Sequence, residues 1–206
     1  MKKNIILSLI AIMATTLSYA HNFKVVNPND KDVDAIYLLE NKTPFSFRGK
    51  TVSFEIDFSS AEIVEFDRDF RTVLRNFGSI DKYNADNGED YVEDWPRDLF
   101  IMTAFACKNL SSVFGAEFVP KEYEGETDYR VVVRMGLFEF GHFVFIGGVK
   151  DGGTVTKGLV EVYDAGGNVL AVYDINYLRG KNVGYGNGDR VRLWGKKFSK
   201  EFKQAL

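Results

Sequence analysis

The sequence contains little cysteine, histidine and proline, and these shortages narrow the class of protein. Its 206 residues include one Cys, two His and four Pro. The lone cysteine, Cys107, cannot form an internal disulfide, so the core alone must stabilise the fold. We find no internal repeat and no change of composition that marks a domain boundary, and the length is typical of one domain.

Long apolar runs are also lacking, apart from one at the start. Lys2 and Lys3 precede the apolar run 5–14, and Ser18-Tyr19-Ala20 has the small-x-small pattern of a signal peptidase site. The run is shorter than the roughly 20 residues of a spanning helix. Residues 1–20 are therefore predicted to be a secretory signal, with no membrane-spanning segment elsewhere.

The residue after the predicted cleavage is not cysteine, which a bacterial lipid anchor requires. We expect an exported protein, periplasmic or secreted, without a lipid anchor. Residues 21–32 form a polar leader, and residues 33–206 are predicted to be the single domain.

An excess of positive charge is absent too. The formal net charge is −3, and loss of Lys2 and Lys3 with the signal takes it to −5. Nucleic-acid binding depends on clustered basic side chains that release counterions, so nucleic acid is excluded as the expected partner.

Periodicity predicts mostly strands. Residues 51–58 alternate strictly, with Val52, Phe54 and Ile56 on one face and polar side chains on the other, which indicates a strand with one solvated face. Residues 164–168 have the composition of a hairpin loop. The other predicted strands are 34–40, 129–140, 142–149, 154–163 and 169–178.

Three segments have the spacing of amphipathic helices. The apolar residues of 66–77 recur at helical spacing and Gly78 follows them, so a helix is expected there. Asp94 and Pro96 indicate the start of a longer helix that ends at Gly115. Residues Val191, Trp194, Phe198 and Phe202 align on a closing helix, and the acidic segment 81–94 is read as a loop. The predicted fold is α+β: a single mixed or antiparallel sheet with helices packed on one face, as a two-layer sandwich.

A resemblance accompanies this pattern. The segments "FEIDFSSAEI", "DYRVVVRM" and "VEVYDAGGNVLA", with a Trp-led helix between the first two and a closing helix at the end, span most of residues 33–206. This order resembles exported Gram-negative envelope domains similar to the amino-terminal domain of the translocation protein TolB and to related lipoprotein domains. The resemblance implies an envelope module used in assembly or protein contact, with no catalytic residues to carry over.

Two metal hypotheses arise. Cleavage after Ala20 would leave His21 at the terminus, where its α-amine and ring could bind copper together with the ring of His142. The acidic segment 81–94 suggests calcium, but taking Gly88 as the loop glycine places no carboxylates at the first ligand positions, and a solvated loop is the alternative.

Aromatic residues, in contrast, are abundant at 15%. The segment 137–148 is apolar on both faces, so it is either a covered central strand or a strand exposed to a partner. The predicted binding surface comprises Phe143, Phe145, Tyr163, Tyr173 and Tyr177. It predicts contact with another envelope protein or macromolecule. The alternative is a carrier whose apolar cleft between sheet and helices, lined by residues 138–146, holds a hydrophobic ligand.

Paired carboxylates that meet across the sheet would be needed for glycoside chemistry, and Glu139, Glu161 and Asp174 are the candidates. Any acidic sheet face offers such pairs, so no catalytic residue is predicted from them.

Overall fold

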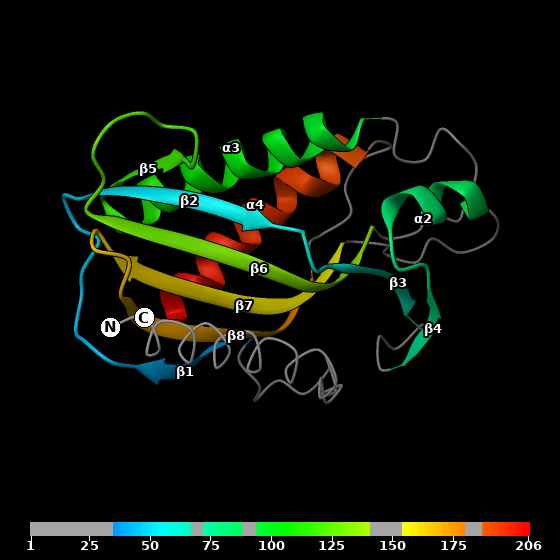
Figure 1. The fold of residues 1–206 in the computed structure, drawn as a ribbon, viewed down its shortest axis with the longest axis horizontal. Helices are drawn as coiled ribbons and strands as arrows, with labels where there is room; N and C mark the ends of the chain where they lie inside the picture. Colours follow the sequence, from blue (N-terminus) through cyan, green and yellow to red (C-terminus); the bar gives the residue numbers. More distant parts are fainter. Residues whose placement is uncertain (1–34, 67–71, 88–93, 141–153, 180–186) are drawn as a thin grey trace, which may run out of the picture.

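The computed structural model describes residues 35–66, 72–87, 94–140, 154–179 and 187–206, and side chains from residue 193 onward in the last range. The α+β class and the mixed sheet are as predicted (Figure 1). The strands are β1 (Ile36–Asn41), β2 (Thr51–Asp57), β3 (Glu62–Phe66), β4 (Val73–Asn76), β5 (Glu117–Pro120), β6 (Tyr129–Glu139), β7 (Val155–Asp164) and β8 (Val169–Arg179). The helices are α2 (Ile80–Asn87), α3 (Trp95–Phe114) and α4 (Asn187–Ala205).

The sheet joins strands that lie far apart in the sequence. Its order is β1-β8-β7-β6-β2-β5, with β3 attached to β6 and β4 attached to β3. Each of the strands β1, β8, β7 and β6 is antiparallel to its neighbour in this order, whereas β2 runs parallel to both β5 and β6. The parallel pairs require crossovers, and α3 lies in the connection from β2 to β6.

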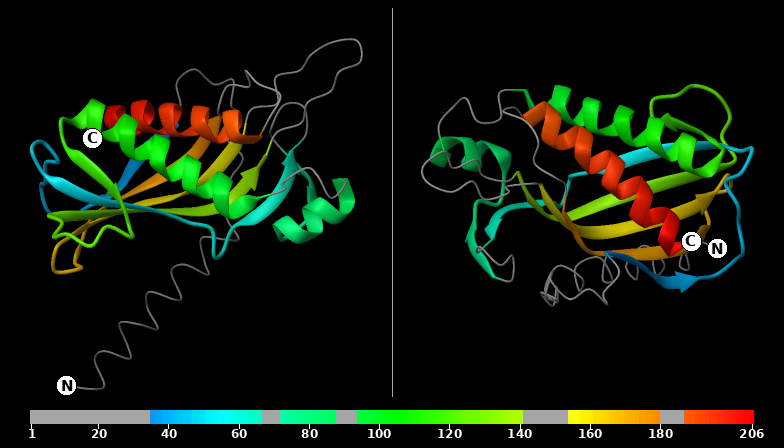
Figure 2. Two further views of the ribbon diagram at one scale, coloured as in Figure 1. Left: turned by 90° about the horizontal axis from the view of Figure 1, so that it is seen from above. Right: turned by 180° about the vertical axis from the view of Figure 1, so that it is seen from behind.

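Helices α3 and α4 lie side by side over the same face of the sheet (Figure 2). On β2 the alternation buries Val52, Phe54 and Ile56 beneath them. The ring of Phe54 is 5.9 Å from that of Phe198, and Trp194 Nε1 donates a hydrogen bond of 2.7 Å to Thr156 Oγ1. The indole N–H is thus satisfied inside the core, as burial requires.

Helix α3 has the limits that its sequence predicts. The Asp94 carboxylate accepts a 3.0 Å hydrogen bond from the Arg97 backbone N–H, and Pro96 occupies the first turn, where a missing N–H costs nothing. Gly115 ends the helix with φ 62°, and its N–H donates to the Ser111 carbonyl. The closing helix is confirmed as well, with Trp194, Phe198 and Phe202 fully buried on one face.

The helix predicted over 66–77 is wrong. Residues 62–66 and 73–76 are strands β3 and β4, which pair antiparallel, and β3 also pairs parallel with β6. Phe66 packs into a small apolar cluster rather than onto a helix face. Strand pairing with distant residues therefore overrides the local 3.6-residue period. The reading of 81–94 as a loop is also corrected in part, because α2 covers Ile80–Asn87.

Candidate functional site

The sheet face opposite α3 and α4, here called the open face, has polar side chains from three adjacent strands. Alternation places Glu55 and Asp57 of β2 there, because Phe54 and Ile56 point to the helices. The same alternation on β6 places Arg130 and Arg134 on the open face. Glu161 and Tyr163 of β7 join them through their register with Val132 and Arg130.

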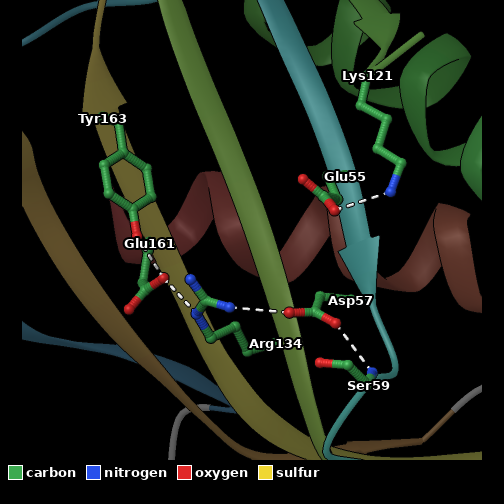
Figure 3. Close-up of polar contacts among 7 residues, drawn as sticks. All are labelled: Glu55, Asp57, Ser59, Lys121, Arg134, Glu161 and Tyr163. Carbon is green, nitrogen blue, oxygen red and sulfur yellow. Dashed lines mark hydrogen bonds and ion pairs between the residues drawn. The ribbon is translucent and has the colours of Figure 1, made fainter. Parts of the chain in front are cut away.

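Arg134 links carboxylates from two strands (Figure 3). Its Nη1 donates to Asp57 Oδ2 at 2.8 Å, and its Nε donates to Glu161 Oε2 at 2.6 Å. Tyr163 OH donates to the same Glu161 oxygen at 2.6 Å. The carboxylate side chains are only 20% and 15% exposed, so these charge-assisted bonds are partly shielded from solvent.

The pKa values of Asp57, Arg134 and Tyr163 are shifted in the directions that keep each side chain in its ordinary charge state at neutral pH. Burial alone would raise the pKa of Asp57, but hydrogen bonds from Ser59 and the guanidinium of Arg134 lower it below the ordinary value. Burial alone would lower the pKa of Arg134, but its hydrogen bonds with Tyr163 and Glu161 raise it above the ordinary value. Burial and the Glu161 carboxylate raise the pKa of Tyr163. The Asp57 carboxylate therefore stays ionised at neutral pH and is not poised as a proton donor, and the Glu161 carboxylate is occupied by its bonds to Arg134 and Tyr163.

Two further contacts extend the polar face along the sheet. The guanidinium of Arg130 lies 4.7 Å from the centre of the Tyr163 ring, a cation–π distance. Lys121 Nζ donates to Glu55 Oε1 at 3.0 Å (Figure 3). The open face thus combines an aromatic ring with hydrogen-bonding groups of both charges, which suits recognition more than acid–base chemistry.

Strand β1 borders this face and, among the described strands, is the edge strand of the sheet at that side. Only its first residue is buried, and Tyr37, Leu38 and Leu39 are 39%, 44% and 38% exposed. A register shift between Leu38 and Glu40 marks a bulge opposite β8. Three consecutive exposed apolar side chains on an edge strand are a place where another chain can add.

A buried amine lies on β7, which β8 separates from this edge. Lys157 is 1% exposed, and desolvation lowers its pKa although Asp174 acts in the opposite direction. Asp174 pairs in register with Tyr37 of β1. Burial raises the pKa of this carboxyl, while a hydrogen bond with Tyr37 opposes that rise.

The three tyrosines of the predicted surface do not share one environment. Tyr163 belongs to the Arg134 network on the open face. Tyr173 is 3% exposed and lies on the helix-covered face, where its ring is 5.2 Å from that of Phe202, so it cannot contact a partner there. Tyr177 packs against the small apolar cluster near β3. Phe143 and Phe145 lie outside the described residues.

The candidate carboxylates for glycoside chemistry lie in three separate settings. Glu161 is held by Arg134 and Tyr163, and Asp174 faces Tyr37. Glu139 is buried at the end of β6, where Phe66 of β3 is a hydrogen-bond partner.

The copper hypothesis concerns His21 and His142, which both lie outside the described residues. Residues 88–93 of the acidic segment do so too. Among the residues that the structure describes, no group of three or more His, Cys, Asp or Glu side chains is arranged to hold a metal ion. Neither hypothesis gains a site from the described part of the chain.

The single cysteine lies inside helix α3. Cys107 is free and buried in α3, and burial raises the pKa of its thiol to about 12. Nucleophilic attack requires the thiolate, so this thiol is inert in the folded protein. In the described ranges, no helix combines the length and apolar composition needed to cross a membrane.

No family model and no curated protein matches the chain. Among solved structures, the PelC dodecamer from Paraburkholderia phytofirmans is 14% identical, with 80% of this chain and 96% of that chain covered and a TM-score of 0.39. A single-residue variant of the same dodecamer is 13% identical, covering 81% and 96%, also with a TM-score of 0.39. An uncharacterised protein is 12% identical, covering 81% and 97%, with a TM-score of 0.34. At these scores the similarity supports no inference about function.

Proposed function

We propose that this chain is an exported, non-enzymatic module of the cell envelope that binds another protein through the open face and strand β1. It would act as a two-layer module, with α3 and α4 supporting one face and leaving the other to the partner. The signal-like residues 1–20 support export, and the acidic balance favours a protein over nucleic acid.

The observation that carries this proposal is the exposed apolar run of β1 next to the polar open face. Tyr37, Leu38 and Leu39 can bury apolar area against an added strand, whose backbone would pair with the sheet edge. Arg130 and Tyr163 offer cation–π and hydrogen-bonding groups for side chains of the same partner. The partner that fits is a protein with an extended, partly apolar segment.

Position-resolved photo-crosslinking in the source cell tests this function. A photoreactive phenylalanine analogue replaces Tyr37 or Tyr163, and a matched variant has it at Lys108, which is exposed on α3. We expect positions 37 and 163 to crosslink the same protein and position 108 to leave it unlabelled. Equal labelling from all three positions, or none from 37 and 163, contradicts the proposal.

A second test uses a substitution on β1 that opposes strand addition. Leu38→Lys places a charge on the free edge, which disfavours pairing with another strand. Leu38 is 44% exposed, so the change should alter the free energy of unfolding by no more than about 0.5 kcal/mol. We expect the crosslink from position 163 to be lost while stability is retained.

The sequence also suggested a carrier of a hydrophobic ligand. In the described part of the segment assigned to its cleft, Phe138 and Phe140 fill the core instead. Their rings are 5.0 Å apart, and that of Phe140 lies 5.3 Å from both Trp95 and Tyr83. These contacts favour the binding module over the carrier.

A further inference from the structure

Strands β3 and β4 form a unit that is joined to the sheet over a short length. β3 pairs with β6 at two positions, Glu62 with Leu137 and Ile63 with Phe138. Among the described residues, β4 pairs with β3 alone. The β3–β4 unit projects at one end of the sheet (Figure 1). Because backbone pairing covers so few positions, the attachment of the β3–β4 unit depends largely on side-chain packing.

Ile63 of β3 packs into the main core, and the rest of the packing is a small apolar cluster. Val64 and Phe66 of β3 and Val155 of β7 are its buried members. The partly buried residues packed against them are Val73, Leu137 and Tyr177. The cluster therefore ties the β3–β4 unit to β6, β7 and β8.

A carboxylic acid lies in this joint. Glu139, the last residue of β6, is 4% exposed and stands opposite Val155 in the ladder. The backbone of Phe66 hydrogen-bonds to its carboxyl group. In the described part of the chain, Glu139 Oε2 has no hydrogen-bond partner. A charge on this carboxyl would thus be incompletely solvated and would lie against apolar side chains.

The surrounding charges compensate an ionised Glu139 only in part. From β3, Glu65 repels an ionised Glu139, and from β8, Arg179 attracts it and Tyr177 lies nearby. On β7 the nearest cation in the ladder is Lys157, opposite Leu137. Burial is the largest effect and raises the pKa of Glu139 to about 8. The protonated acid is therefore the form that fits the closed joint at neutral pH.

We propose that Glu139 makes attachment of the β3–β4 unit pH-dependent: the neutral acid keeps the unit on the sheet, and loss of its proton favours release. Release brings Glu139 to water and separates it from Glu65. It also leaves the edge of β6 unpaired beside Leu137 and uncovers the apolar surface of Val155. The device is independent of the proposed partner surface on β1.

The direction of the effect follows from linkage. In the open state Glu139 titrates near the ordinary value of 4.5, and in the closed state near 8. Between these values opening releases a proton, so the open fraction rises by up to about tenfold for each pH unit. Above about 8 the carboxyl is ionised in both states, and the dependence ends. Acid therefore favours the closed form.

Hydrogen exchange measured by mass spectrometry on residues 21–206 tests the proposal between pH 5 and 9. Rates are corrected for the intrinsic pH dependence of exchange, and peptides from β7 and β8 provide the internal reference. We expect opening of peptides 62–66 and 73–76 to increase about tenfold per pH unit up to about pH 8 and then level off. A flat profile overturns the proposal, as does parallel loss of protection in β7 and β8, which indicates global unfolding.

Three variants assign the effect to Glu139. Glu139→Gln should abolish the slope, and an unchanged slope in that variant overturns the proposal. Glu65→Gln removes a like charge, so the levelling-off should move to lower pH, and it remains informative if the first variant does not fold. Glu117→Gln, exposed on β5, is the matched control and should retain the wild-type profile.

Discussion

Arg134 joins three strands through its side chain because it donates to a carboxylate on either side. Asp57 lies 77 positions earlier in the sequence and Glu161 lies 27 positions later. Loss of the guanidinium would leave both carboxylates facing each other across β6 with their charges uncompensated. Removing one partner of a partly buried ion pair costs more stability than the intact pair contributes, because an uncompensated charge remains.

We therefore predict that Arg134→Met lowers the free energy of unfolding by about 1–3 kcal/mol. Urea denaturation followed by the fluorescence of Trp95 and Trp194 measures it. Lys121→Met, which removes the more exposed ion pair with Glu55, is the matched control and should cost less than about 1 kcal/mol. Equal losses in the two variants would contradict a special role for Arg134.

The same network predicts a pH dependence in acid. The pKa of Asp57 is lowered in the folded protein, so its contribution to stability is complete above its unfolded value of 3.8 and is lost as the pH falls through the folded value. Arg134→Met should weaken this acid dependence because one of the groups that lowers the pKa is removed. Denaturation midpoints between pH 5 and 3 measure the difference.

Cys107 gives a second prediction at the scale of one residue. Its buried thiol should react with a water-soluble disulfide reagent at least 100-fold more slowly in the native protein than in urea, since a thiolate forms only near pH 12 in the fold. The absorbance of the released reagent anion follows the rate. Reaction at the unfolded rate would show that α3 is not packed as described.

Helices α3 and α4 approach closely at one glycine. A Cβ built on Gly195 would lie 2.9 Å from the backbone nitrogen of Ala106 and 3.1 Å from its Cα. Both are backbone atoms, so the side chain of a neighbour cannot simply rotate away. The small residue sets the distance between the two helices.

Gly195→Ala should thus destabilise the protein by about 1–3 kcal/mol, even though alanine favours a helix by about 1 kcal/mol. Thermal unfolding followed by circular dichroism tests this. Lys196→Ala changes the next, exposed residue of α4 and should stay within about 0.5 kcal/mol of wild type. A more stable Gly195→Ala protein would mean that helix propensity outweighs the close contact.

The elements differ in how well the sequence predicts them, and the reason is physical. Helix α3 is defined by signals within its own segment, namely Asp94, Pro96 and Gly115. The region of β3 and β4 has apolar residues at helical spacing, but pairing of Ile63 with Phe138, far along the chain, decides its structure. Short strands have too few residues for alternation to oppose a false helical pattern.

The candidate site was predictable only in part for the same reason. The alternation of β2 predicts that Asp57 lies on the solvated face, and Tyr163 belongs to the binding surface that the sequence predicts. Arg134 and Glu161 could not be identified as partners, because the register of β6 with β7 includes a shift between Met135 and Leu137. Local periodicity does not predict such a shift, and it did not separate buried Tyr173 from Tyr163.

At the scale of the molecule, the described strands belong to one sheet, and every described element except β4 contributes to one main core. We expect a protein of residues 33–206 to unfold in one cooperative transition, with fluorescence and circular dichroism reporting the same midpoint. A protein of residues 43–206 lacks β1, so Ile175 and Tyr173 lose their ladder partners Ile36 and Leu38, and it should lose several kcal/mol of stability. Two separate transitions in the longer protein would contradict a single domain.

The pairing of β1 with β8 also has a consequence during synthesis. Ile36 of β1 lies opposite Ile175 of β8. Strand β1 therefore cannot pair until β8, which is made much later, has left the ribosome. At roughly 5–20 residues per second, that interval is on the order of ten seconds. Throughout it, the apolar side chains of a nascent β1 have no native neighbour, and a chaperone that holds extended apolar segments would find its target there. Because of this strand order, the pairing of the sheet is complete only when nearly the whole chain has been made.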